Sequence, residues 1–208
     1  IAMIKAKHHP VLYPFFKWLC FFLIRRNFKT MHLQSDFNDN GSAVLVIANH
    51  ISWWDGFWIE YLNQKRLKRT FHFMMLEEQL RKHWYFQLIG GFSINRKSRD
   101  VINSINYTNE LLKNSQNVVL MFPQGKIHSA YNANFVFERG VQHVVDNAAD
   151  ATQVLFVANF TEYLSDTKPH VYCYAKTYLA DELKEFEVEA AYNLFYRSVI
   201  NQHKNISC

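Results

Sequence analysis

The sequence predicts one α/β domain, with a mostly parallel or mixed sheet flanked by helices and an amphipathic helical segment at its N-terminal end. Short apolar runs rich in Val, Ile and Leu alternate with longer segments of helical periodicity from residue 43 onward. This alternation is typical of a sheet with helices on its faces. A chain of 208 residues, 49% of them hydrophobic, is long enough to form one domain with a substantial core.

The N-terminal segment contains a Phe- and Leu-rich stretch from Pro10 to Ile24. Basic residues flank this stretch: Lys5, Lys7, Arg25, Arg26 and Lys29. As a helix it would cover roughly 22 Å, short of the roughly 30 Å hydrocarbon core of a bilayer. Two interpretations stay open: a helix in the membrane interface, or an amphipathic helix packed on the domain. We place residues 1–34 in a membrane-interface segment and residues 35–208 in the main domain.

Apolar runs and periodic segments predict each further element in turn. Strands are predicted over residues 43–48, 70–75, 92–95, 117–122, 153–158 and 170–176. Helices are predicted near residues 53–64, 77–85, 98–114, 138–148 and 185–203. The first strand is apolar at every position, which predicts that it is buried.

A His and an Asp follow this strand directly, in the motif Asn49-His50-Ile51-Ser52-Trp53-Trp54-Asp55. A His at the end of the strand would face the edge of the sheet where α/β folds place ligands. A carboxylate one helical turn further on can reach back to the imidazole. A His held by a carboxylate is suited to act as a general base near neutral pH. Because such a pair also arises by chance, its meaning depends on the motifs that follow.

The second motif begins with Gly90 and Gly91 and ends at Arg96, in Gly-Gly-Phe-Ser-Ile-Asn-Arg. The chain has only six glycines, and glycine permits turns and close approach of the backbone to a ligand. A guanidinium group matches the geometry of phosphate, so Arg96 is the candidate residue for an anionic head group.

The third motif is Phe122-Pro123-Gln124-Gly125, followed by Lys126. Gln124 can form a hydrogen bond with an acceptor hydroxyl, Gly125 can offer a backbone N–H, and Lys126 can supply a positive charge. These three residues are the candidates for an acceptor pocket, with Asn49, Gly90, Gly91, Phe122 and Pro123 as supporting motif residues.

In this order, His-x-x-x-x-Asp, a Gly pair leading to Arg, and Phe-Pro-x-Gly resemble the glycerophospholipid acyltransferase superfamily, which includes the lysophosphatidic acid acyltransferases. The resemblance spans about residues 43–160. It implies transfer of a fatty acyl group from acyl-CoA or acyl carrier protein, as co-substrate, to a lipid hydroxyl. No other cofactor and no metal are expected. His50 would be the base, Asp55 its orienting partner and Arg96 the head-group residue.

The third motif departs from the family's common Phe-Pro-Glu-Gly-Thr-Arg-Ser. Gln124 replaces the Glu, and Lys126-Ile127 replaces the Thr-Arg pair. The family default acceptor is 1-acylglycerol-3-phosphate, and a different lipid, glycolipid or pigment acceptor is the alternative. A non-catalytic lipid-binding module is the alternative from another class.

Charge and cysteine content bear on the partner and the compartment. Residues 1–100 hold 15 Lys and Arg against 7 Asp and Glu, whereas residues 101–208 hold 8 against 11. A basic N-terminal half favours an anionic membrane surface, and no nucleic-acid-binding motif accompanies it. Three cysteines fit no disulfide framework, which suits a reducing compartment. The expected location is the cytoplasmic face of a bacterial inner membrane, as a peripheral or monotopic protein.

Overall fold

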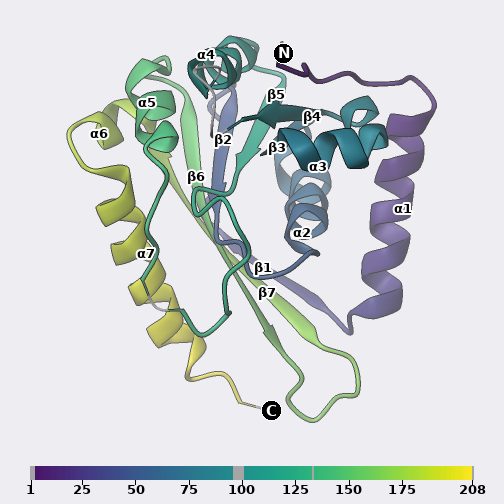
Figure 1. Cartoon of the computed structure of the whole chain (residues 1–208). Coiled ribbons are helices and arrows are strands. Elements are labelled where there is room, and N and C mark those ends of the chain that lie inside the picture. Colours follow the sequence, from purple (N-terminus) through teal and green to yellow (C-terminus); the bar gives the residue numbers. More distant parts are fainter. Residues whose placement is uncertain (1–2, 96–100, 133, 208) are drawn as a thin grey trace.

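A seven-stranded mixed sheet forms the centre of the molecule, with strand order β1-β7-β6-β2-β5-β3-β4 (Figure 1). The computed structural model describes residues 3–95, 101–132 and 134–207. The strands are β1 (Met31–Ser35), β2 (Val44–Ala48), β3 (Thr70–Leu76), β4 (Gly91–Ile94), β5 (Asn117–Met121), β6 (Gln153–Glu162) and β7 (His170–Leu179). Neighbouring strands are parallel except β6 and β7, which pair antiparallel.

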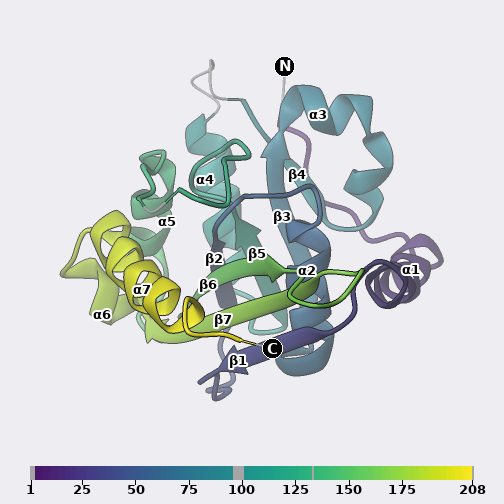
Figure 2. The same ribbon diagram turned by 90° about the horizontal axis from the view of Figure 1, so that it is seen from below.

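Helices cover both faces of the sheet, which confirms the predicted α/β class (Figure 2). They are α1 (Leu12–Asn27), α2 (Asp55–Leu62), α3 (Glu77–Lys82), α4 (Val101–Leu112), α5 (Gly140–Asn147), α6 (Ala180–Lys184) and α7 (Val188–His203). The helices α4, α5 and α7 bury Ile105, Val144 and Tyr192 against one face. The other face receives Ile59 and Leu62 of α2.

All six predicted strands are present as β2 to β7, and β6 and β7 extend several residues further than expected. Every residue of β2 is buried, because a central parallel strand is covered on both faces. The strand β1 was not predicted. It pairs with β7 at the edge of the sheet, and it spans residue 34, where the sequence analysis had divided the chain.

Three predicted helices are divided or shorter in the structure. The helix expected over residues 53–64 consists of α2 followed by a π-helical turn, Asn63–Leu67. The one expected over 77–85 consists of α3 and a 3₁₀ turn, Trp84–Leu88. The one expected over 185–203 is α7, which begins three residues later, and the short helix α6 before it was not predicted. Such breaks depend on local hydrogen bonding, and the spacing of apolar residues does not predict where that bonding changes.

The N-terminal helix α1 packs on α2. The thiol of Cys20 donates to the carbonyl oxygen of Phe57 at 3.3 Å, and the ring of Phe21 stacks on Tyr61 with centroids 4.9 Å apart. The outward side of α1 is also apolar, with exposed Val11, Phe15, Trp18 and Phe22. The structure therefore shows α1 packed on the domain, with an apolar side left exposed. In the described part of the chain, no helix has the length and apolarity that crossing a bilayer requires.

A buried carboxyl group lies at this interface. Glu60 of α2 is fully buried, and it accepts hydrogen bonds from Asn63 at 2.9 Å and Gln64 at 3.1 Å. Burial raises the pKa of Glu60 to about 7, although the bond from Asn63 and the nearby ammonium of Lys17 act in the opposite direction. The side chain of Gln64 also donates to the carbonyl of Lys17 at 3.2 Å, which links the carboxyl group to α1.

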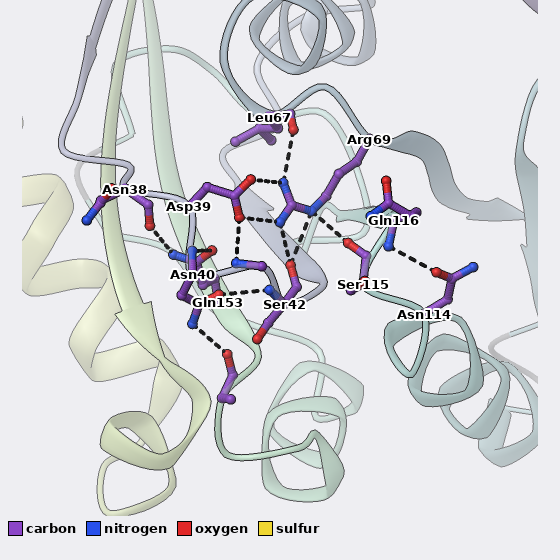
Figure 3. A network of polar contacts seen from close by, with 12 residues as sticks. Asn38, Asp39, Asn40, Ser42, Leu67, Arg69, Asn114, Ser115, Gln116 and Gln153 are labelled. Atoms are coloured by element: carbon purple, nitrogen blue, oxygen red, sulfur yellow. Dashed lines mark hydrogen bonds and ion pairs between the residues drawn. The ribbon is translucent and has the colours of Figure 1, made fainter.

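A polar network centred on Arg69 joins the loops at the amino ends of the central strands (Figure 3). The guanidinium group contacts the Asp39 carboxylate through two nitrogens, at 2.6 and 3.1 Å. It also donates to the backbone carbonyls of Ser42, Ser115 and Leu67. One side chain therefore satisfies carbonyl groups that precede β2, β3 and β5. This network holds the edge of the sheet opposite the carboxyl ends of those strands.

Candidate active site

The strand β2 delivers His50 to the carboxyl edge of the sheet. It lies between β5 and β6, and the chain leaves it at Ala48. His50 follows two residues later, with 22% of its side chain exposed. The carboxyl edge of a parallel sheet is where α/β proteins bind ligands. The position predicted from the sequence is therefore the position that the imidazole occupies.

His50 and Asp55 form a hydrogen-bonded pair. The Nδ1 atom of His50 lies 2.7 Å from Oδ2 of Asp55, whose side chain is fully buried. The same oxygen accepts the backbone N–H groups of Ile51 at 2.7 Å and Ser52 at 2.9 Å. Asp55 begins α2, where the helix dipole favours negative charge.

Burial raises the pKa of the Asp55 carboxyl above its ordinary value, while the hydrogen bond from His50 and those from the backbone act to lower it. The carboxyl group is held in one orientation by three donors. With Nδ1–H donating to Asp55, the Nε2 atom of a neutral His50 is left unprotonated and can accept a proton.

The third motif and the residues directly after it contact His50 at three points. The Phe122 ring is stacked on the imidazole, with centroids 4.1 Å apart and planes 10° from parallel. The Oε1 atom of Gln124 accepts the His50 backbone N–H at 2.7 Å. The His128 backbone N–H donates to the His50 carbonyl at 2.9 Å. These contacts bring together residues more than 70 positions apart, which spacing in the sequence could not show.

Asn49 fixes the exit from β2. Its side-chain amide donates to the carbonyl of Asn159 at 2.9 Å and accepts the N–H of Asn159 at 2.8 Å. The amide side chain thus continues the pairing of β2 with β6 for one further step, beyond the Asn49 backbone N–H, which donates to the Val157 carbonyl at 3.4 Å. Asn159 was not predicted as a site residue. The only signal was its place near the end of an apolar strand.

The other predicted residues differ in their relation to this pair. Gly90 and Gly91 lie at the amino end of the edge strand β4, opposite the edge that carries His50. A Cβ atom on Gly90 would collide with the carbonyl oxygen of Phe71, and one on Gly91 would lie 2.8 Å from the carbonyl oxygen of Phe86. Both glycines therefore permit close packing within the protein. Arg96 lies outside the described residues.

Residues of the proposed acceptor pocket are placed as follows. The N–H of Gly125 donates to the carbonyl of Phe122 at 3.0 Å, so it closes a turn in this structure. Gly125 has φ of 66°, which favours glycine. Lys126 is exposed, and the carbonyl of Pro123 accepts the N–H of Glu138 at 2.9 Å.

A concavity of about 370 Å³ borders the loop that carries the pair. Its lining includes Ile51, Ser52, Trp54 and Trp58, together with Tyr163 and Pro169 from the connection between β6 and β7. A larger concavity, about 570 Å³, lies between the N-terminal segment and α3. Neither His50 nor Asp55 lines either concavity. The smaller one lies beside the pair, because Ile51 and Ser52 in its lining donate their backbone N–H groups to Asp55. Among the described residues, no group of three or more His, Cys, Asp or Glu side chains is arranged to hold a metal.

Comparison with known proteins gives two matches. A family model described as Acyltransferase matches residues 24–160, more than half of the chain. A protein of Streptococcus pneumoniae (strain ATCC BAA-255 / R6), described as a 1-acyl-sn-glycerol-3-phosphate acyltransferase, is 28% identical over 88 residues. The aligned stretch covers 41% of this chain and 32% of that relative, so the chain matches about a third of the relative's length.

Proposed function

Since the chain belongs to the acyltransferase family and is an enzyme of that type, we propose that it transfers a fatty acyl group from acyl-CoA or acyl carrier protein to the hydroxyl of a lipid acceptor. The observation that carries this proposal is the pair of His50 and Asp55, with 2.7 Å between Nδ1 and Oδ2. The carboxyl group is fully buried, whereas the imidazole is partly exposed. A buried orienting group beneath an accessible base is the arrangement that general-base catalysis requires.

The reaction proceeds by direct attack. The Nε2 atom of His50 takes the proton of the acceptor hydroxyl while the hydroxyl oxygen attacks the thioester carbonyl. The carbon–sulfur bond then breaks, and the imidazolium returns the proton to the departing thiolate. Asp55 holds the imidazole in the required tautomer and stabilises the imidazolium. An ester and a free thiol are formed, and no acyl-enzyme is needed.

The proposed acceptor is 1-acylglycerol-3-phosphate, which the name of the Streptococcus pneumoniae relative indicates for that protein. Arg96 is the proposed phosphate ligand, because a guanidinium group binds phosphate through two hydrogen bonds. A different lipid, glycolipid or pigment acceptor is favoured by one observation: Lys126-Ile127 stands where the related motif commonly has Thr-Arg, so that arginine is missing from the motif.

The proposed location is an anionic membrane surface, on the cytoplasmic face of a bacterial inner membrane. The outward side of α1 supports a peripheral attachment, because Phe15, Trp18 and Phe22 are exposed there. Arg25 and Arg26 follow in its last turn. Apolar side chains beside basic ones are the combination that binds an anionic interface.

The test compares wild type with His50→Ala, using one labelled acyl donor, a panel of lipid acceptors and mass spectrometry of the products. We expect wild type to acylate at least one acceptor and His50→Ala to lose that activity. His143→Ala, which removes an exposed His on α5, is the matched control and should behave as wild type. Turnover by His50→Ala near the wild-type rate, or a trapped acyl-enzyme, would refute the mechanism. A wild type that binds lipid but turns over no donor would indicate a lipid-binding module.

A further inference from the structure

The short segment from Phe122 to His128 holds the main chain of His50 on both sides. The Gln124 side chain accepts the N–H of His50 at 2.7 Å, and the N–H of His128 donates to its carbonyl at 2.9 Å. Phe122 stacks on the ring itself. Both backbone groups of His50 and one face of its imidazole are therefore fixed by a single segment of the chain.

The side chain of Gln124 is not accessible to a ligand. Only 5% of the residue is exposed, and its Nε2 atom is buried without a hydrogen-bond partner among the described residues. A side chain that contacts an acceptor hydroxyl would need a polar atom open to the site. Within the described part of the chain, the hydrogen bond that the Gln124 side chain makes is directed at the backbone of His50.

The hydrogen bond lies where the chain leaves the sheet. The last paired residue of β2 is Ala48, and the side chain of Asn49 takes over the pairing with β6. His50 therefore has no strand partner for its N–H, and a buried donor without an acceptor is unfavourable. Gln124 supplies the acceptor, and in doing so it fixes the backbone angles from which the imidazole reaches Asp55.

We propose that Gln124 is a positioning residue: its carbonyl oxygen holds the backbone N–H of His50 so that the imidazole meets both Asp55 and the substrate. This inference rests on the proposed function for its kinetic consequences. It departs from the expectation that Gln124 binds the acceptor. A displacement of about 1 Å in a reacting group can lower the rate about 10²-fold, so loss of this bond should act on kcat.

Glu at this position would keep the hydrogen bond, because a carboxylate oxygen accepts an N–H as an amide oxygen does. Leu has similar bulk and no acceptor. The two substitutions thus separate the hydrogen bond from the identity of the amide. Gln116→Leu is the matched control, since Gln116 is an exposed glutamine that precedes β5 at the opposite edge of the sheet.

The experiment measures two quantities for wild type, Gln124→Leu, Gln124→Glu and Gln116→Leu. The first measurement is steady-state kinetics, which gives kcat and the KM values for acceptor and donor. The second is hydrogen exchange of the His50 backbone amide by NMR, which requires no activity. We expect Gln124→Leu to lose about 10- to 100-fold in kcat, to keep the acceptor KM within about twofold, and to lose protection of the His50 amide. Gln124→Glu should keep that protection and the wild-type acceptor KM.

Two results would overturn the inference. One is a large rise in acceptor KM with kcat unchanged in Gln124→Leu, which would make Gln124 an acceptor ligand. The other is an equally protected His50 amide in wild type and Gln124→Leu, which would show that the bond does not hold it. If Gln124→Leu fails to fold, a raised acceptor KM or a lost amide protection in Gln124→Glu refutes the inference, and wild-type values support it. An inactive wild type would refute the proposed function, while amide exchange would still decide the role of Gln124.

Discussion

Replacing Glu60 by Gln should make the stability of the protein less dependent on pH. Glu60 is fully buried between α1 and α2, and burial raises its pKa from 4.5 to about 7. In the unfolded chain the group ionises near the lower value. Between the two values the unfolded chain is therefore ionised while the folded protein is protonated. The stability that this group contributes is fully present below the unfolded pKa and is lost as pH rises through the folded pKa.

The magnitude follows from the size of the shift. One pKa unit corresponds to about 1.4 kcal/mol, so the full shift amounts to roughly 3 kcal/mol. Between pH 5 and pH 8 the wild type should lose roughly 2–3 kcal/mol of unfolding free energy through this group alone. Glu60→Gln should not show this loss. It should be about 1 kcal/mol less stable than wild type at pH 5, because the amide NH2 group would face one of the two donors, Asn63 or Gln64, that now face carboxyl oxygens.

Urea unfolding of wild type and Glu60→Gln at pH 5 and pH 8 isolates the contribution of Glu60 to the unfolding free energy, because the other titrating groups contribute equally to both proteins. Glu78→Gln, which replaces an exposed carboxylate on α3, is the control and should follow the wild type. Parallel loss of stability in wild type and Glu60→Gln over this range would refute the reasoning about the buried carboxyl group.

Four further substitutions test other parts of the structure. Asp55→Asn should lower kcat roughly 10²–10⁴-fold, because an amide neither orients the imidazole correctly nor stabilises its cation; an unchanged kcat would contradict this role. Arg96→Ala should raise the acceptor KM about ten- to a hundredfold with little change in donor use, and Arg96→Lys should restore only part of the loss. If Arg96→Ala leaves the KM of every acceptor unchanged, Arg96 does not bind a phosphate group. Trp18→Ser combined with Phe22→Ser should reduce sedimentation with anionic vesicles while leaving the thermal midpoint almost unchanged, and equal sedimentation would argue against a membrane face on α1. Arg69→Met should lower the free energy of unfolding by about 3 kcal/mol in urea titrations, since several buried carbonyls lose their donor; a change below about 1 kcal/mol would show that water replaces the guanidinium.

The vesicle experiment uses point substitutions because α1 is part of the core. Cys20, Ile24 and Phe28 are buried in one cluster with Phe57 and Trp58. Deleting residues 1–28 would expose the apolar face of α2, and the truncated protein would then bind lipid or aggregate for reasons unrelated to α1. Exposed side chains on the outer face of the helix can be changed without this effect.

Much of the fold could be predicted because its central strands are apolar on both faces. The runs at β2 and β6 are recognisable without any knowledge of their neighbours. The edge strand β1 was missed because Met31-His32-Leu33-Gln34-Ser35 alternates for only five residues and runs directly into a polar turn. A short alternating stretch becomes a strand only when a partner, here β7, is present.

The pair of His50 and Asp55 could be predicted from their spacing after an apolar strand, but the geometry differs from the expected helical turn. Asp55 is the first residue of α2, and the turn before it brings the carboxylate back to His50. The contacts of Gln124 and Asn159 could not be predicted in this way. They depend on which strand lies beside β2, and that is decided by tertiary packing across 74 and 110 residues of chain. The glycines of the second motif were expected near a ligand, yet they are required by close packing around β4.

The position of β2 between β5 and β6 has a consequence for the order in which the site can form during synthesis. Both members of the pair emerge early, in the first 55 residues, whereas the strands on either side of β2 end at residues 121 and 162. Contacts between such distant segments form slowly, because long stretches of chain must close before they are made. A nascent chain that stops short of β6 would carry His50 and Asp55 but would lack Asn159. Assembly of the base is therefore tied to completion of the sheet.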